Sequence, residues 1–221
     1  MFKAQTEWAK PEEFPDLRQA DTIAIDLETH DPDLKSKGSG SVVGRGKVVG
    51  IAIAVDGYSG YFPFDHKGGG NLEKSKVIEW FKDVCECPAD KIFHNAMYDV
   101  CWIRAMGIKI NGNIYDTMIA ASLVNENRFR FDLGSLGWDY VGRGKNETEL
   151  KEAANEWGVD PKADMWMLPA MYVGNYAQRD AELTLDLWKA MQKEISDQDL
   201  GSIFELETDL FPCLVDMKFK G

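Results

Sequence analysis

The sequence predicts an α/β fold in which a mixed sheet, with its first three strands antiparallel, is flanked by helices. Three strand-like apolar runs follow one another early in the chain, and Asp56-Gly57 is a typical hairpin turn between the last two. Two further short strands then alternate with helical patterns, and helical patterns continue to the end. The expected strands span residues 22–29, 48–55, 60–64, 91–93 and 114–116.

Helices are expected where apolar residues recur every three or four positions. Asn95 suits the N-cap of a helix that ends at Met106, and Gly107 suits the position after its C-terminus. Residues 1–20 are expected to form an irregular lead-in. The glycine-rich segment 30–46 lacks the lysine-plus-hydroxyl ending of a phosphate-binding loop, which favours a flexible loop. The other expected helices span residues 72–84, 117–123, 147–157 and 170–195.

Composition places the chain among globular proteins. Its 221 residues are 44% hydrophobic and 28% charged, enough for one sizeable core or one domain with an appendage. No apolar run approaches the ~20 residues that span a bilayer, and residues 1–7 lack the apolar stretch of a secretory signal. The four cysteines form no CxxC pair, which favours reduced thiols. We therefore expect a cytoplasmic protein without a membrane partner.

The net charge of −12 argues against a polyanionic partner, because nucleic acids are mostly recruited by basic surfaces. The objection weakens if several of the 37 acidic residues bind metal ions, since a bound cation reverses the local field. It also weakens if a separate basic module holds most of the substrate.

The first expected strand carries two acids on one face. Side chains alternate along a strand, so Asp26 and Glu28 share a face with Ala24, and the opposite face is apolar. Crowded carboxylates disfavour joint ionisation, and a divalent cation with oxygen ligands would offset that cost. An edge strand with a solvated outer face is the alternative.

Two later helices repeat the arrangement. Asp99 lies on the same helical face as Trp102 and Ile103, and Asp180 lies on a face with Tyr176 and Leu183. A single buried acid can be satisfied by backbone hydrogen bonds, but convergence on shared cations satisfies four acids together. Two Mg²⁺ or Mn²⁺ ions roughly 4 Å apart would suit hydrolysis of a phosphodiester. Tyr176, with an ordinary pKa of about 10, suits orientation of a water better than a general base.

Three motifs, in order and at suitable spacing, resemble those of the DEDD 3′–5′ exonucleases of the tyrosine subclass. Asp26-Leu27-Glu28-Thr29 is similar to the first motif, Asn95–Asp99 to the second and Tyr176–Asp180 to the third. The resemblance covers roughly residues 20–195 and implies a ribonuclease-H-like fold.

The resemblance also implies roles for these residues. Asp26, Glu28 and Asp180 would hold the cation that activates water, and Asp99 with Asp26 would hold a second cation beside the leaving 3′ oxygen. Tyr176 would position the nucleophile. The expected cofactors are two divalent cations, Mg²⁺ or Mn²⁺.

The particular resemblance is to the proofreading domain of phage-type family A DNA polymerases. The insertion at 31–46, the segment 129–136 and the helical ending at 203–221 carry it. Phage origin would place the protein in a bacterial host cytoplasm. We expect a lead-in at 1–20, an exonuclease domain at 21–197 and, at 198–221, a helix leading into a polymerase domain that this chain lacks. A truncated polymerase and a free-standing exonuclease both fit.

Substrate contacts are expected on weaker grounds. Family analogy suggests that Leu27 and Met97 wedge the terminal base. Basic residues of the later chain could contact phosphates, although solvated surface charge is favoured for each one, namely Arg128, Arg130, Arg143, Lys145 and Arg179. The expected substrate contacts are Leu27, Thr29, Asn95, Met97 and Arg179.

The sequence therefore predicts a metal-dependent 3′–5′ exonuclease that releases nucleoside 5′-monophosphates from DNA 3′ ends in replication proofreading. Its expected partners are a single-stranded DNA 3′ end and a polymerase domain on the same or an associated chain. RNA 3′ trimming of the ribonuclease D kind is one alternative. A catalytically silent module that only binds a 3′ end is another.

Overall fold

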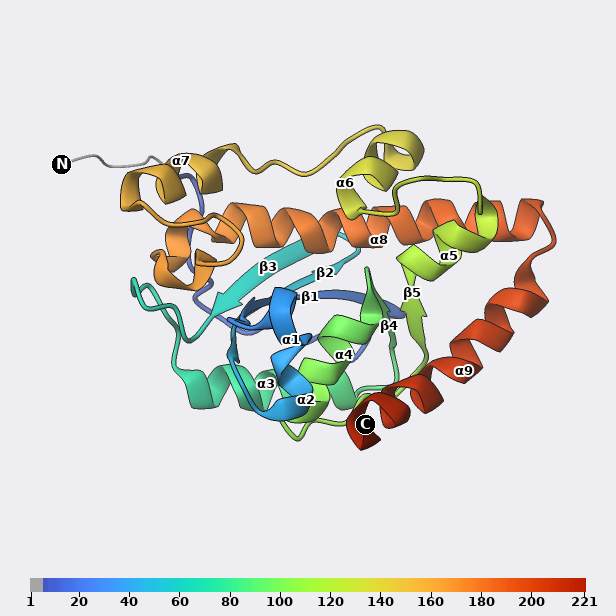
Figure 1. Ribbon diagram of the computed structural model, residues 1–221, viewed down its shortest axis with the longest axis horizontal. Helices are drawn as coiled ribbons and strands as arrows, with labels where there is room; N and C mark the ends of the chain where they lie inside the picture. The colour runs from blue at the N-terminus through green and yellow to red at the C-terminus, as the bar shows by residue number, and fades with distance from the viewer. Residues whose placement is uncertain (1–5) are drawn as a thin grey trace.

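The computed structural model describes residues 6–221, in which helices cover both faces of a central sheet (Figure 1). Residues 6–20 contain no helix or strand, as expected for a lead-in. Residues 1–5 lie outside the described residues. The expectations that they belong to the lead-in and carry no secretory signal therefore stay predictions.

The sheet has five strands in the order β3-β2-β1-β4-β5. β1 pairs antiparallel with β2, and β2 with β3, whereas β4 runs parallel to both β1 and β5. The mixed sheet with three antiparallel strands is therefore confirmed. The acidic strand β1 is central, so the edge-strand alternative is wrong. The strands are β1 Thr22–His30, β2 Lys47–Val55, β3 Tyr58–Pro63, β4 Asp90–Phe93 and β5 Ile114–Asp116.

The β2–β3 hairpin turns through Asp56 and Gly57, where Gly57 adopts a left-handed φ of +79°. Small residues of β2 face the acids of β1, since Ala52 pairs with Asp26 and Gly50 with Glu28. A Cβ at Gly50 would lie 2.1 Å from the hydroxyl oxygen of Tyr61. A side chain at position 50 would thus collide with the tyrosine that packs beside this part of β1.

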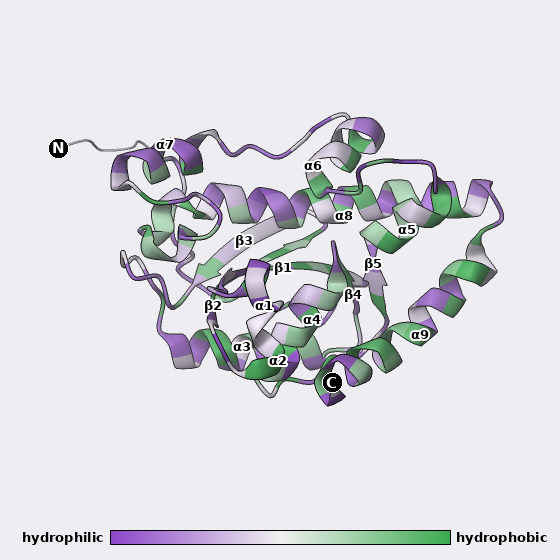
Figure 2. Ribbon diagram, in the orientation of Figure 1, coloured by the Kyte–Doolittle hydropathy of each residue, from purple (hydrophilic) through white to green (hydrophobic). Residues whose placement is uncertain are grey.

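Two apolar layers hold the sheet between helices. On one face Ile23 and Ile25 pack with α3 (Lys74–Glu86) and α4 (Ala96–Ala105). On the other face Ala24 packs in a layer with α5 (Thr117–Val124) and α8 (Gly174–Asp197). Figure 2 shows α8 with alternating hydrophobic and hydrophilic stretches, as expected of a helix with one buried side. The strand alternation thus turns the acidic face of β1 toward α8.

Two expected boundaries are wrong. The loop expected at 30–46 contains two short helices, and the Asp31 carboxylate anchors the second by accepting a hydrogen bond from the Gly40 N–H. The helix expected at 170–195 begins at Gly174, after a 3₁₀ turn. The remaining elements are α1 Leu34–Lys37, α2 Gly40–Val43, α6 Leu133–Leu136, the π-helical turn η1 Gly137–Val141, α7 Thr148–Trp157, the 3₁₀ turns η2 Met165–Met167 and η3 Ala170–Tyr172, and α9 Gly201–Lys220.

α4 is capped differently from the expectation. Asn95 occupies the N-cap position in a left-handed conformation (φ +68°), and its side chain accepts no capping hydrogen bond. Instead, the Asp116 carboxylate at the end of β5 accepts hydrogen bonds from the N–H groups of Asn95 and Ala96. The expected helix end is confirmed, since Gly107 follows the helix with a φ of +75°.

All four cysteines are unpaired, in agreement with the expectation of free thiols. Within residues 6–221, every helix is too short or too polar to cross a lipid bilayer.

Candidate active site

Four acids that the sequence singles out lie between β1, α4 and α8. Asp26 and Glu28 extend from the α8-facing side of β1, Asp26 half-buried and Glu28 buried. The parallel pairing of β4 with β1 covers only Thr22–Ala24, so the rest of β1 is free on that side. Asp99, in the first turn of α4, reaches this free edge and accepts a hydrogen bond of 3.0 Å from the Leu27 N–H. Asp99 is thereby fixed beside the strand that carries the other two acids.

α8 brings the fourth acid and the tyrosine. Tyr176 and Asp180 are one helical turn apart, on the face that packs over β1 and β2, and Asp180 is only 1% exposed. The acidic residues of β1 and α8 therefore lie on the sides of these two elements that pack together.

The carboxylates perturb one another. Burial, and next the charge of Asp180, raise the pKa of Asp26 to about 7. Burial, followed by the charges of Asp26 and Asp180, raises the pKa of Glu28 well above its usual range. The pKa of Asp99 is likewise raised well above its usual range by burial and then by Asp26. Like charges at this density need a cation nearby to remain ionised.

Two buried oxygens of this group lack a partner. Glu28 Oε1 and Asp180 Oδ1 have no hydrogen-bond donor within the part of the chain that the structure describes. Hard divalent cations prefer such carboxylate oxygens, so the donor set fits Mg²⁺ or Mn²⁺. Among residues 6–221, however, no three His, Cys, Asp or Glu side chains are gathered closely enough to hold an ion as they stand.

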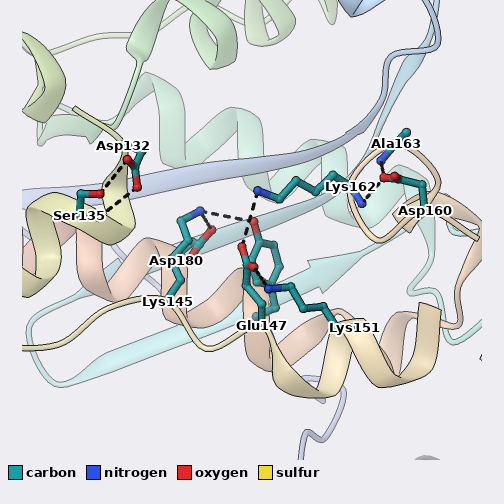
Figure 3. A network of polar contacts seen from close by, with 10 residues as sticks. Asp132, Ser135, Lys145, Glu147, Lys151, Asp160, Lys162, Ala163 and Asp180 are labelled. Carbon is teal, nitrogen blue, oxygen red and sulfur yellow. Dashed lines mark hydrogen bonds and ion pairs between the residues drawn. The ribbon is translucent and has the colours of Figure 1, made fainter. Parts of the chain in front are cut away.

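A lysine occupies part of this space. Lys145 Nζ forms an ion pair with Asp180 Oδ2 and lies 3.4 Å from the hydroxyl oxygen of Tyr176 (Figure 3). Burial lowers the pKa of Lys145, but the opposing charges, led by that of Asp180, outweigh it and raise the pKa above its usual value. The interpretation of Lys145 as a solvated surface charge is wrong, because a basic segment alone does not reveal which side chain turns inward.

A cleft of about 660 Å³ opens onto Asp26 between α6, the segment before α7 and the start of α4. Four basic and three acidic residues line it, whereas the whole chain carries 25 basic and 37 acidic residues. Trp138, 65% exposed, forms part of its wall. The charged lining residues are Asp26, Arg130, Asp132, Lys145, Glu147, Lys151 and Lys162.

The volume of a cavity does not by itself locate the site in this protein. A larger groove of about 730 Å³ lies between α4 and α9, and none of Asp26, Glu28, Asp99 and Asp180 lines it. Its wall is mostly apolar, and the perturbed acids lie elsewhere.

The expected substrate contacts are distributed unevenly. Asn95 lines the cleft. Thr29 is bonded through its hydroxyl to the hydroxyl of Tyr98 at 2.7 Å, and Arg179 pairs with Glu182. Met97 is half-buried against the apolar layer under α4. The Leu27 side chain is buried in that same layer, on the opposite face from Asp26, and its expected contact with a terminal base stays a prediction.

Comparison with known proteins shows the family of this chain. The family model for 3′–5′ exonuclease matches residues 5–196. The DNA-directed DNA polymerase of Pseudomonas phage M6 is 35% identical over 225 residues, which cover 98% of this chain and 34% of that polymerase. The chain therefore spans about a third of the length of this relative.

Solved structures share the fold. Brucella melitensis NrnC bound to pGG superimposes with a TM-score of 0.67 at 17% identity, covering 94% of this chain and 90% of NrnC. Trypanosoma brucei RNase D superimposes with a TM-score of 0.58 at 20% identity, covering 79% of this chain and 58% of RNase D. Both likenesses confirm a ribonuclease-H-like fold. The family is shown by the sequence matches, which cover most of the chain. The chain belongs to the 3′–5′ exonuclease domain family of family A DNA polymerases.

Proposed function

We propose that this exonuclease domain removes nucleoside 5′-monophosphates from single-stranded DNA 3′ ends, with two divalent cations, as the proofreading activity of a polymerase. The observation that carries the proposal is the buried acid group with unpartnered oxygens on Glu28 and Asp180, next to a cleft with an excess of basic residues.

Different sets of the four acids would hold the two cations. Asp26, Glu28 and Asp180 would hold one, and Asp99 together with Asp26 would hold the second. When bound, two such cations supply an activated water and stabilise the oxygen that leaves. The hydrogen bond from the Leu27 N–H keeps Asp99 beside β1, where it can share a cation with Asp26.

Tyr176 would orient the attacking water through its hydroxyl. Burial, and then the charges of Asp180, Glu28 and Asp26, raise the pKa of this phenol well above its usual value. The phenol therefore stays protonated at neutral pH, which suits a hydrogen-bonding role and argues against a general base.

The cleft supplies the path for the nucleic acid. Arg130, Lys151 and Lys162 line it and would contact backbone phosphates, while Trp138 offers an exposed ring for a base to stack on. The cleft is lined by more basic than acidic residues, which would favour a polyanionic substrate there despite the overall charge of −12.

The rest of the polymerase is proposed from the relatives. The phage M6 polymerase extends well beyond the part that this chain matches. We place the exonuclease domain at 21–197 and propose that 198–221, which includes α9, leads toward a polymerase domain. Outward-facing apolar residues on α9 would pack against it, namely Leu206, Leu210, Leu214 and Met217.

Digestion of labelled oligonucleotides tests the function. DNA and RNA of equal sequence, labelled at the 5′ end, are incubated with the protein and Mg²⁺ or Mn²⁺, and with excess EDTA. We expect stepwise shortening of DNA from its 3′ end and no shortening in EDTA. Faster degradation of RNA would favour ribonuclease D-like trimming. Binding of DNA without cleavage in either metal would favour a silent 3′-end module.

A further inference from the structure

Lys145 lies deeper in the acidic site than the other lysines of the cleft. Its side chain is 26% exposed, whereas those of Lys151 and Lys162 are 59% and 75% exposed. Lys151 and Lys162 both pair with Glu147 at the mouth (Figure 3). Lys145 instead pairs with the buried Asp180. Two lysines therefore lie at the mouth of the cleft and one lies inside it.

The backbone brings Lys145 to this position. The segment that joins η1 to α7 passes tightly against Trp138, where a Cβ on Gly144 would lie 2.3 Å from the indole nitrogen. Gly142, two residues earlier, has a left-handed φ of +76°. The segment therefore requires glycine where it approaches the tryptophan, and the next residue extends its side chain toward α8.

Among the four acids, Asp180 is the one that pairs with this ammonium. Asp180 Oδ2 pairs with Lys145, while Asp180 Oδ1 and Glu28 Oε1 have no partner. The ammonium carries one charge and satisfies one of these oxygens, whereas a divalent cation would carry two charges and accept several oxygens. A cation that binds Asp180 through Oδ2 would compete with Lys145 Nζ for that oxygen.

We propose that Lys145 is a built-in counter-cation, which neutralises Asp180 in the metal-free protein and must be displaced before a divalent cation binds there. This inference rests on the proposed function, because it assumes that the acid group binds divalent cations. It explains why the acids are close enough to perturb one another but are not gathered around a common point. Lys145 thereby lowers the affinity of the site for metal.

Calorimetric titration of the metal-free protein with MnCl₂, without nucleic acid, tests the proposal. Lys145→Met keeps the length of the side chain and removes its charge. We expect it to tighten the Mn²⁺ dissociation constant by about tenfold or more, since a charge-assisted hydrogen bond no longer competes. Lys145→Arg, which keeps a cation, should remain close to the wild type.

Lys151→Met is the matched control, because it removes the same charge from the same cleft without touching Asp180. Screening by solvent and salt limits its expected effect on the Mn²⁺ dissociation constant to less than about twofold. Equal tightening by Lys145→Met and Lys151→Met would reduce the effect to general charge removal and overturn the displacement proposal.

The wild-type protein provides a readout that does not depend on a variant folding. Acylation of lysines by an amine-reactive ester, followed by peptide mass spectrometry, reports the accessibility of each ammonium. We expect saturating Mn²⁺ to speed acylation of Lys145 and to leave that of Lys151 unchanged. An unchanged or slower rate at Lys145 would overturn the proposal.

The two experiments also separate this inference from the proposed function. If wild type and Lys145→Met bind Mn²⁺ with equal affinity, only the displacement proposal fails. If neither binds Mn²⁺, the proposed metal-dependent function fails with it. Tighter binding by Lys145→Met, together with faster acylation of Lys145 in Mn²⁺, supports both.

Discussion

Two buried carboxylates near the same end of the sheet are compensated in opposite ways. Asp116 is 8% exposed and accepts hydrogen bonds from the N–H groups of Asn95, Ala96 and Met118 at 3.0, 2.8 and 2.9 Å. Asp180 is 1% exposed, pairs one oxygen with Lys145 and leaves the other without a partner. Burial raises the pKa of both groups, so a raised pKa does not distinguish them.

The two carboxylates differ in whether their hydrogen-bond donors can move away. The donors to Asp116 are main-chain groups at the first turns of α4 and α5, which cannot move without unravelling both helices. The donor to Asp180 is the end of a flexible side chain, which can rotate away and leave its place to another cation. Asp116 therefore caps two helices, whereas Asp180 keeps an oxygen that a cation could bind.

Removing the Asp180 carboxylate should give the largest effect on catalysis. Asp180→Ala takes away a proposed cation ligand and an unpartnered oxygen, so we expect cleavage of single-stranded DNA to slow by roughly 10³-fold or more, with the fold retained. Single-turnover digestion and circular dichroism measure the two. A loss of less than tenfold would remove Asp180 from the proposed cation ligands.

Removing the Asp116 carboxylate should instead act on stability. Asp116→Ala leaves three N–H groups unpaired and uncaps two helices, so we expect the free energy of unfolding to fall by about 2–4 kcal/mol. Urea titration measures the loss, and calorimetry on the folded variant should show an unchanged Mn²⁺ affinity. Lost Mn²⁺ binding at unchanged stability would erase the contrast with Asp180.

A smaller effect is expected from the tyrosine that accompanies Asp180. Tyr176→Phe keeps the ring and removes the hydroxyl, so we expect cleavage to slow by about 10–100-fold while Mn²⁺ affinity is unchanged. The comparison is with Asp180→Ala under the same single-turnover conditions. A loss as large as that of Asp180→Ala would mean that Tyr176 does more than orient water.

A further effect is expected on the pH dependence of the free energy of unfolding, measured in EDTA. The pKa of Asp26 rises to about 7 in the folded protein because of burial and then Asp180, whereas an unfolded aspartate titrates near its ordinary pKa of 3.8. The native state therefore binds the extra proton, and the free energy of unfolding should fall as pH rises from about 4 to about 7. Urea titrations at pH 5 and 7.5 measure this fall. Asp26→Asn should reduce it, and an equal fall in that variant would assign the effect to other groups.

The sequence predicted the acidic face of β1 and the acids of α4 and α8 because the periods of two and 3.6 depend only on local geometry. The same local geometry predicted the hairpin at Asp56-Gly57 and the helix end at Gly107. What these patterns lack is the identity of partners far away in the chain.

The errors at Asn95 and Lys145 follow from such partners. Asparagine is a preferred residue type at an N-cap, but the carboxylate of Asp116, 21 residues after Asn95, caps this helix instead. Lysine is typical of protein surfaces, but Lys145 extends inward and pairs with Asp180. The neighbouring Gly144 lies close against Trp138. Leu27 adjoins two acids in sequence, and the strand alternation places it on the other face of the sheet.

The central claim is that the group of four acids holds divalent cations, and anomalous diffraction from crystals soaked in MnCl₂ tests it most directly. We expect an anomalous peak in contact with Asp26 and Asp180, with Lys145 Nζ withdrawn from Asp180. Crystals of Asp180→Ala, soaked identically, should lose density at that position. A wild-type map with no peak at these acids, and with Lys145 still paired to Asp180, would contradict the account.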